Sequence, residues 1–119
     1  MITWQIEISR PTPSGNAIRH KHWRATYNEQ KWWARQLSLL VIAHKIPAAT
    51  GKRNVTIGRI GKRNLDIDNL YAGLKPVLDA MRQAGLIRDD DEAHLGLTAF
   101  QRRTESRQPA FTIITLADA

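Results

Sequence analysis

The stretch LDIDNLYAGLKPVLDAMRQAGLIRDDDE, residues 65–92, combines most of the negative charge of the chain with a strong helix signal. It holds seven of the eleven acidic residues but three of the eighteen lysines and arginines, which gives a net charge of −4 against +11 for the remaining residues. A basic surface attracts a polyanion, whereas clustered carboxylates repel one unless a metal ion lies between them. This conflict is the first indication of function.

Apolar residues recur at helical spacing in the middle of this stretch: Leu70, Leu74, Val77, Leu78 and Met81. We expect Asp68 or a neighbour to cap the helix and Gly85 to end it. Pro76 lacks a backbone N–H and disfavours a helical conformation at the residue before it. The sequence therefore predicts a kink or a fresh helix start near Lys75.

The segments on either side show alternating and helical patterns. We expect strands at residues 2–9, 54–60, 94–101 and 109–116 and a helix at residues 28–45. Asn28 is a suitable cap for that helix, and Gly58 indicates a bulge in the second strand. Residues 109–116 are apolar on both faces, which favours a central position in a sheet. The element order predicts a single α+β domain, residues 1–119, with helices on one face of a small mixed sheet.

Two segments outside the acidic stretch give further signals. Residues 10–26 contain prolines and several cations without an apolar period, so we expect a loop. His20, His22 and Trp23 lie among these cations, and such a loop could grip phosphates and stack on a base, or simply be solvated. Residues 39–43 are apolar on most faces of the expected helix, which predicts either deep burial or a subunit interface.

Composition narrows the class of protein. At 119 residues the chain fits one domain of ordinary size, and it has no cysteine, which excludes disulfides and thiol chemistry. No apolar run reaches the roughly 20 residues of a membrane span, so we expect a soluble cytoplasmic protein. A net charge of +7 and a pI near 10.4 favour a nucleic acid as partner over a small acidic metabolite.

Asp66 and Asp68 lie two residues apart, and both side chains leave the same face if the chain is extended there. A helix and a return loop could bring the second acidic group, Asp89 to Glu92, back to them. Mg²⁺ suits a site of one to three carboxylates plus a substrate phosphate, and it lowers the pKa of a bound water. Lys75 could orient that water or stabilise the transition state. The alternative is a capping turn at Asp66 and Asp68 followed later by a solvated charge run.

Eight residues of the acidic stretch follow one another in a distinctive order: Asp66, Asp68, Asn69, Leu70, Lys75, Gly85, Asp89 and Asp90. In this order the stretch resembles the RusA family of Holliday-junction resolvases. The family motif is an Asp, any residue, Asp, Asn, Leu at the start of a helix that bears a Lys, then a Gly and an Asp pair four residues later. The segment PTPSGNAIRH also looks like the family's Pro, Ser, Asn loop. The resemblance implies a homodimeric, magnesium-dependent endonuclease that makes paired nicks in four-way DNA junctions.

Carried over position by position, the resemblance implies that Asp66, Asp68 and Asp90 are catalytic. The same three residues and Asp89 would bind Mg²⁺, or Mn²⁺ in its place. Lys75 matches the catalytic lysine, although it follows the second Asp by seven positions where the family pattern has four. Three residues are close to one helical turn, so Lys75 could still point to the same side.

Basic residues outside the acidic stretch are the expected phosphate contacts: Arg10, Arg19, Lys21, Arg24, Lys62, Arg63, Arg102 and Arg103. Ordinary solubility charge is the alternative for each of them. Phosphate contacts and metal ligands say little about DNA shape, so a nuclease acting on flaps or forks remains open. A third interpretation is a non-catalytic nucleic-acid-binding module whose carboxylates are structural.

Overall fold

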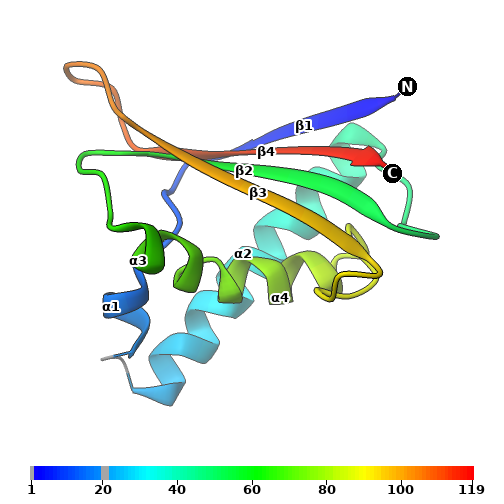
Figure 1. The fold of residues 1–119 in the computed structure, drawn as a ribbon, viewed down its shortest axis with the longest axis horizontal. Coiled ribbons are helices and arrows are strands. Elements are labelled where there is room, and N and C mark those ends of the chain that lie inside the picture. Colours follow the sequence, from blue (N-terminus) through cyan, green and yellow to red (C-terminus); the bar gives the residue numbers. More distant parts are fainter. Residues whose placement is uncertain (1, 20–21) are drawn as a thin grey trace.

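The computed structural model describes residues 2–19 and 22–119. These residues form, in chain order, β1 (Thr3–Ile8), α1 (Gly15–Arg19), α2 (Trp23–His44), β2 (Arg53–Gly61), α3 (Ile67–Ala72), α4 (Lys75–Gln83), β3 (Leu95–Arg103) and β4 (Phe111–Asp118). The strands make a mixed four-stranded sheet, and the helices pack below it in the view of Figure 1. The predicted α+β class is therefore confirmed.

β4 lies inside the sheet, as its apolar pattern predicts. The strand order is β1-β4-β2-β3; β4 pairs antiparallel with β1 and β2, and β2 pairs parallel with β3. Ile114 of β4 therefore lies between Ile6 of β1 and Ile57 of β2, and all three are buried. This topology makes β1, β2 and β3 run toward the same end of the sheet, where the acidic stretch begins (Figure 1).

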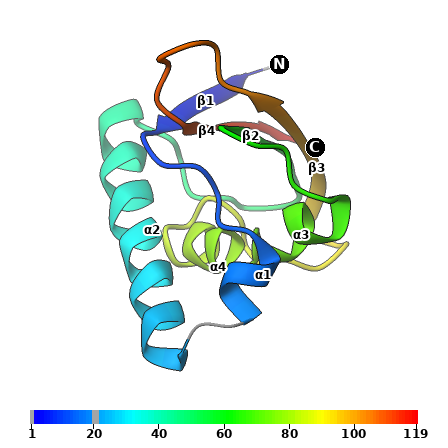
Figure 2. The same cartoon turned by 90° about the vertical axis from the view of Figure 1, so that its left-hand side faces the viewer.

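The core lies between one face of the sheet and the helices α2 and α4. α2 contributes Trp33 and Leu37, and α4 contributes Val77 and Met81, all of them fully buried. Burial of one large apolar side chain contributes roughly 1.5–3 kcal/mol. α2 crosses beside α4 below the sheet (Figure 2), so one core fixes both the strands and α4.

The first third of the chain is more helical than predicted. α2 begins at Trp23, and α1 also lies within residues 10–26, so the prediction of a loop is confirmed for residues 10–14 and wrong for residues 15–19 and 23–26. His22 caps α2 in place of Asn28, because its Nδ1 accepts the backbone N–H of Arg24 at 3.2 Å. The first turns of α2 are largely exposed and therefore lack the apolar period that marks a helix in a sequence.

The second half of α2 carries apolar side chains on its outer face. Leu39 is 59 % exposed and Ile42 is 74 % exposed, so the prediction of deep burial for residues 39–43 is wrong within one chain. The other prediction for this segment, a subunit interface, stays a prediction. No helix in the described part of the chain is both long and apolar enough to cross a membrane.

The acidic stretch folds into two helices, which confirms the predicted fresh start at Lys75. α4 begins there with Pro76 in its first turn, and α3 ends just before Gly73. A Cβ atom on Gly73 would collide with the carbonyl oxygen of Pro13, so the close approach of the Pro13 backbone to this break needs a glycine. Gly85 ends α4 in the left-handed conformation, with φ at 79°, as predicted.

The predicted bulge at Gly58 is wrong. β2 pairs without interruption with both of its neighbours, and Gly58 lies opposite Phe100 of β3 and Ile113 of β4. A Cβ atom on Gly58 would overlap the ring of Phe100. The glycine therefore permits the close approach of an aromatic ring and leaves the strand regular.

Candidate active site

The start of α3 lies at the end of the sheet that β1, β2 and β3 reach together. Asp66 precedes α3 with an extended backbone, and Asp68 lies in its first turn. Gln101 of β3 holds the residue before them: its Nε2 donates to the carbonyl oxygen of Leu65 at 2.6 Å, and its Oε1 accepts the N–H of Leu65 at 2.7 Å. β3 therefore fixes the backbone next to both carboxylates.

Asp66 and Asp68 are both exposed to solvent. Asp66 occupies the cap position of α3, but its side chain makes no capping hydrogen bond. Within residues 2–19 and 22–119, no cation forms an ion pair with either carboxylate. Two like charges this close in the chain repel each other, and a bound cation would relieve that repulsion.

Asn69, the next residue of the motif, connects α3 to α1. Its Oδ1 accepts a hydrogen bond from the guanidinium of Arg19 at 3.0 Å, and the same group of Arg19 donates to Asn16 Oδ1 at 2.7 Å. Gly15 permits the approach of α1, because a Cβ atom there would lie 2.6 Å from that of Ala72. The two segments that carry the resemblance, although distant in sequence, therefore form one surface.

Lys75 lies between two carboxylates at the start of α4. Its Nζ is 3.1 Å from Asp79 Oδ1, one turn along the helix, and 3.2 Å from Asp90 Oδ2 in the loop after α4. The hydrogen bonds to Asp79 and then to Asp90 raise the pKa of Lys75, and the hydrogen bond from Lys75 lowers the pKa of Asp90. Lys75 and Asp90 are therefore both charged at neutral pH.

The remaining acids after α4 have their own partners. Asp89 Oδ1 accepts the backbone N–H of Asp90 at 2.8 Å and lies 3.6 Å from the guanidinium of Arg82. Asp91 Oδ1 accepts the backbone N–H of His94 at 3.1 Å and lies 2.6 Å from its Nδ1. The acidic run is therefore an ordered turn in which Asp90, and not Asp91, reaches Lys75.

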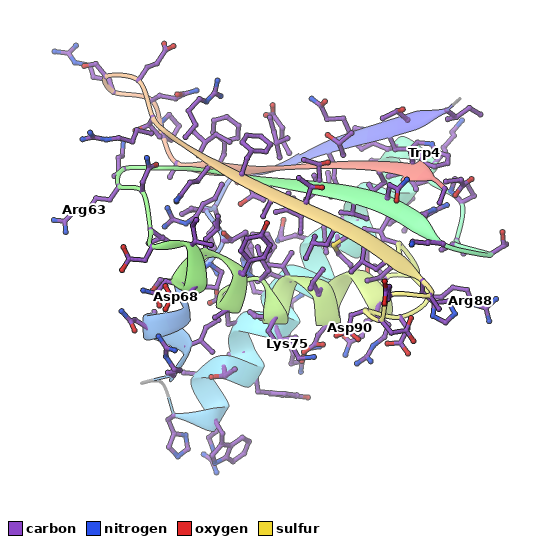
Figure 3. The ribbon with its side chains drawn as sticks, in the orientation of Figure 1. Trp4, Arg63, Asp68, Lys75, Arg88 and Asp90 are labelled. Atoms are coloured by element: carbon purple, nitrogen blue, oxygen red, sulfur yellow. The ribbon has the colours of Figure 1, made fainter. Side chains whose placement is uncertain are left out.

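The structure does not bring the two acidic groups into one cluster. Figure 3 shows Asp68 beside α1 and α3, whereas Lys75 and Asp90 lie together next to α4. No group of three or more histidine, aspartate or glutamate side chains suited to a metal ion forms among the described residues. The predicted metal ligands are thus divided into Asp66 with Asp68 at one place and Asp89 with Asp90 at another.

Four of the predicted phosphate contacts lie at the same end of the sheet as Asp66. Arg63, Arg102 and Arg103 are exposed, and Arg63 projects from the tip in Figure 3. Lys62 Nζ donates to the carbonyl oxygen of Gln108 at 2.6 Å, which ties the β2 turn to the β3–β4 loop. This basic tip provides exposed cations close to the start of α3.

The other predicted phosphate contacts have different surroundings. Arg10 lies 3.5 Å from Glu29 and stacks 3.7 Å from the ring centroid of Trp32, so the fold itself uses its charge. Arg24 is exposed and lies 5.3 Å from the ring centroid of Trp23. The predictions for His20 and Lys21 fall outside the described residues.

The sequence did not predict a structural role for two arginines whose side chains face the interior. Arg53 is 1 % exposed; its Nε donates to Asp118 at 2.9 Å and its NH1 to the carbonyl oxygen of Leu86 at 3.0 Å. Arg59 Nε donates to the carbonyl oxygen of Thr12 at 2.8 Å, and burial lowers the pKa of Arg59. Both occupy the inward positions of an alternating strand, a signal that could have identified them as structural residues.

Comparison with known proteins gives no match: no family model and no curated protein sequence is similar to this chain. Three features bear on function: the exposed carboxylates of Asp66 and Asp68 at the start of α3, which have no ion-pair partner among the described residues, the lysine at the start of α4 that lies between two carboxylates, and the basic tip of the sheet.

Proposed function

We propose that this protein is a magnesium-dependent endonuclease that cuts four-way DNA junctions by paired nicks. We further propose that it acts as a homodimer in the cytoplasm, in DNA recombination and repair. Its basic surface would attract DNA, and its exposed carboxylates would admit the metal ion that DNA cleavage requires. The order of motif residues in the acidic stretch supplies the substrate class.

One observation carries this proposal, the contact between Lys75 and Asp90. The family pattern places its lysine three residues nearer the second Asp, so Lys75 lies almost one helical turn further along the chain. Here the extra residues coincide with the break between α3 and α4. The lysine still meets an aspartate of the motif, at 3.2 Å. The contact therefore supports Lys75 as the counterpart of the motif lysine, which is the position where this sequence departs most from the family pattern.

The donor atoms at the start of α3 fit magnesium. Mg²⁺ prefers hard oxygen ligands and is commonly held by one or two carboxylates, with waters and substrate phosphates completing its shell. Asp66 and Asp68 are exposed and have no ion-pair partner among the described residues, so they would hold the metal. Bound there, Mg²⁺ or Mn²⁺ would supply an activated water. Asp90 would instead act by holding Lys75, with Asp89 supporting the turn.

Lys75 would act as a fixed positive charge. The raised pKa keeps its ammonium protonated, so it suits the stabilisation of negative charge on a phosphate in the transition state better than proton abstraction. Asp79 and Asp90 hold the ammonium from two sides and limit its rotamers. The lysine is thereby positioned before the substrate arrives.

Two further surfaces suit a dimeric junction enzyme. The basic tip formed by Lys62, Arg63, Arg102 and Arg103 would contact the phosphates of a DNA arm. The exposed apolar side chains of Leu39 and Ile42 on α2 would be covered by the second subunit. Two copies of the site would then cut two strands of one junction.

The test is incubation of the protein with a synthetic four-way junction and Mg²⁺, followed by denaturing electrophoresis and a separate binding assay. We expect paired nicks from the wild-type protein and, from Asp68→Asn, binding without nicks. Glu92→Gln removes a carboxylate of the same stretch to which no role is given, and it should cut like the wild type.

Two results would redirect or reject the proposal. Cutting of flaps or forks while the four-way junction stays intact would keep the nuclease and change its substrate. Binding of the junction by the wild-type protein without any cutting, in Mg²⁺ and in Mn²⁺, would leave only a non-catalytic nucleic-acid-binding module.

A further inference from the structure

A groove of about 460 Å³ lies between the first turns of α2 and the start of α4. Trp23 and Tyr27 of α2 form one wall, Ile18 of α1 adds an apolar contact, and Lys75 and Pro76 of α4 line the opposite side. Its volume is in the range of pockets that bind small organic groups. The groove therefore has the size and the walls of a ligand site, next to the proposed catalytic lysine.

The aromatic wall is unusually exposed. Trp23 is 65 % exposed and Tyr27 is 52 % exposed, and they lie one turn apart on the same side of α2. Single exposed apolar residues are common on proteins, but two large rings lining one groove mark a binding surface. Flat aromatic faces of this kind stack on nucleobases, largely without regard to sequence.

Cations accompany both rings. The guanidinium of Arg24 lies 5.3 Å from the centroid of Trp23, and Lys31 Nζ lies 5.2 Å from the centroid of Tyr27. A planar group stacked on these rings would have positive charge within reach of any phosphate attached to it. This combination matches a nucleotide better than an uncharged aromatic compound.

The opposite wall leads to the proposed site of cleavage. Asp79 lines the groove and lies 3.1 Å from Lys75 Nζ, which in turn contacts Asp90 at 3.2 Å. Gln30 of α2 also lines the groove and adds an amide beside the rings. These polar groups could hydrogen-bond the edge of a base whose faces are covered by the aromatic wall.

We propose that this groove binds one unpaired nucleobase of the DNA strand that is cut, by stacking it on Trp23 and Tyr27. The inference rests on the proposed nuclease function and deepens it. A base leaves its stack most easily where pairing is interrupted, as at the crossover of a branched DNA. Capture of that base beside Lys75 would place the adjoining backbone at the lysine.

The test uses four-way junctions that carry 2-aminopurine at single positions around the crossover, because this fluorescent base is quenched when it stacks on an aromatic ring. We expect the wild-type protein to quench it at one or a few positions. Trp23→Ala and Tyr27→Ala should remove the quenching and weaken junction binding about tenfold each. Trp23→Phe should retain most of both.

Tyr71→Ala is the matched control, because Tyr71 is an aromatic residue of α3 that is 44 % exposed and lies outside the groove. It should quench and bind like the wild type. The thermal unfolding midpoint of each variant shows whether it is folded. We expect all of them to be folded, because the replaced rings are exposed and contribute little to the core.

The outcomes separate this inference from the nuclease proposal. Quenching that depends on Trp23, in a protein that binds junctions without cutting them, supports the base site and rejects only the nuclease. Nicking by the wild type without quenching at any position, or unchanged quenching by Trp23→Ala, would overturn the base site and leave the nuclease standing. A wild-type protein that binds no junction would overturn both.

Discussion

The two ends of the acidic stretch carry the same kind of residue in opposite environments. Asp66 and Asp68, at the start of α3, are exposed and have no ion-pair partner in the described part of the chain. Asp79 and Asp90, on and after α4, share the ammonium of Lys75 at 3.1 and 3.2 Å. Acidic residues that are clustered in a sequence can therefore differ in the structure: some carboxylates are available to a ligand, and others already form ion pairs within the protein.

Under the proposed function, the two places would have different tasks. Asp66 and Asp68 lie beside the basic tip, where a metal ion could join protein oxygens to phosphate oxygens. Lys75 and its partners lie along α4, beside a groove with an aromatic wall. The break between α3 and α4 separates the two places, and the core under α4 holds them at a fixed separation.

The largest expected effect is on the rate of DNA cleavage, when the same substitution, Asp to Asn, is made at each of the two places. We expect Asp68→Asn to lower the rate of junction nicking in Mg²⁺ by about 100-fold or more, because it would remove one of the two proposed metal ligands. Asp90→Asn should lower it by roughly tenfold, because Lys75 keeps its contact with Asp79. The rates are measured with enzyme in excess over DNA. Equal losses in the two variants would mean that both carboxylates serve one centre.

The next effect concerns the break that separates the two places. Gly73→Ala should lower the free energy of unfolding by about 1–3 kcal/mol, because the added methyl group would collide with the carbonyl oxygen of Pro13. Urea unfolding measures this change. Gly51→Ala is the control, since no atom lies within 4 Å of a Cβ atom there. A Gly73→Ala variant as stable as the wild type would show that the break is not held by this contact.

The smallest effect is the pH dependence of the Lys75 pair. Because the pKa of Asp90 is lowered in the fold, the pair stabilises the protein above roughly pH 4, and this stabilisation is lost as the pH falls through the lowered pKa. Both side chains are partly exposed, so we expect a few tenths of a kcal/mol. The stability difference between the wild type and Asp90→Asn should shrink between pH 6 and pH 3. A stability difference that stays constant between pH 6 and pH 3 would show that the ionisation of Asp90 does not stabilise the protein.

Local patterns in the sequence predict much of the fold. Alternating apolar residues mark the strands because side chains on a strand alternate between its faces, and Ile6 and Ile8 of β1 are indeed buried. Pro76 predicts the start of α4 because proline has no backbone N–H and is tolerated in the first turn of a helix but not in its interior. α1 and the first turns of α2 escape prediction, since α1 has five residues and both are largely exposed.

The candidate site is less predictable because it depends on tertiary contacts. The sequence predicts that Asp66, Asp68, Lys75 and Asp90 are functional side chains, but it does not predict which of them are in contact. The path of the chain after α4 is fixed by contacts from elsewhere, such as the buried Arg53 bonded to the carbonyl oxygen of Leu86. No local pattern reports such a bond, which holds the chain four residues before Asp90.

The most direct test of this division is where a divalent cation binds. In a titration of ¹⁵N-labelled protein with Mn²⁺, the paramagnetic ion broadens the amide signals of nearby residues. We predict that the signals of residues 66–69 weaken at the lowest Mn²⁺ concentrations, while those of residues 89–91 persist. Broadening that begins at residues 89–91, or equally at both segments, would contradict the account.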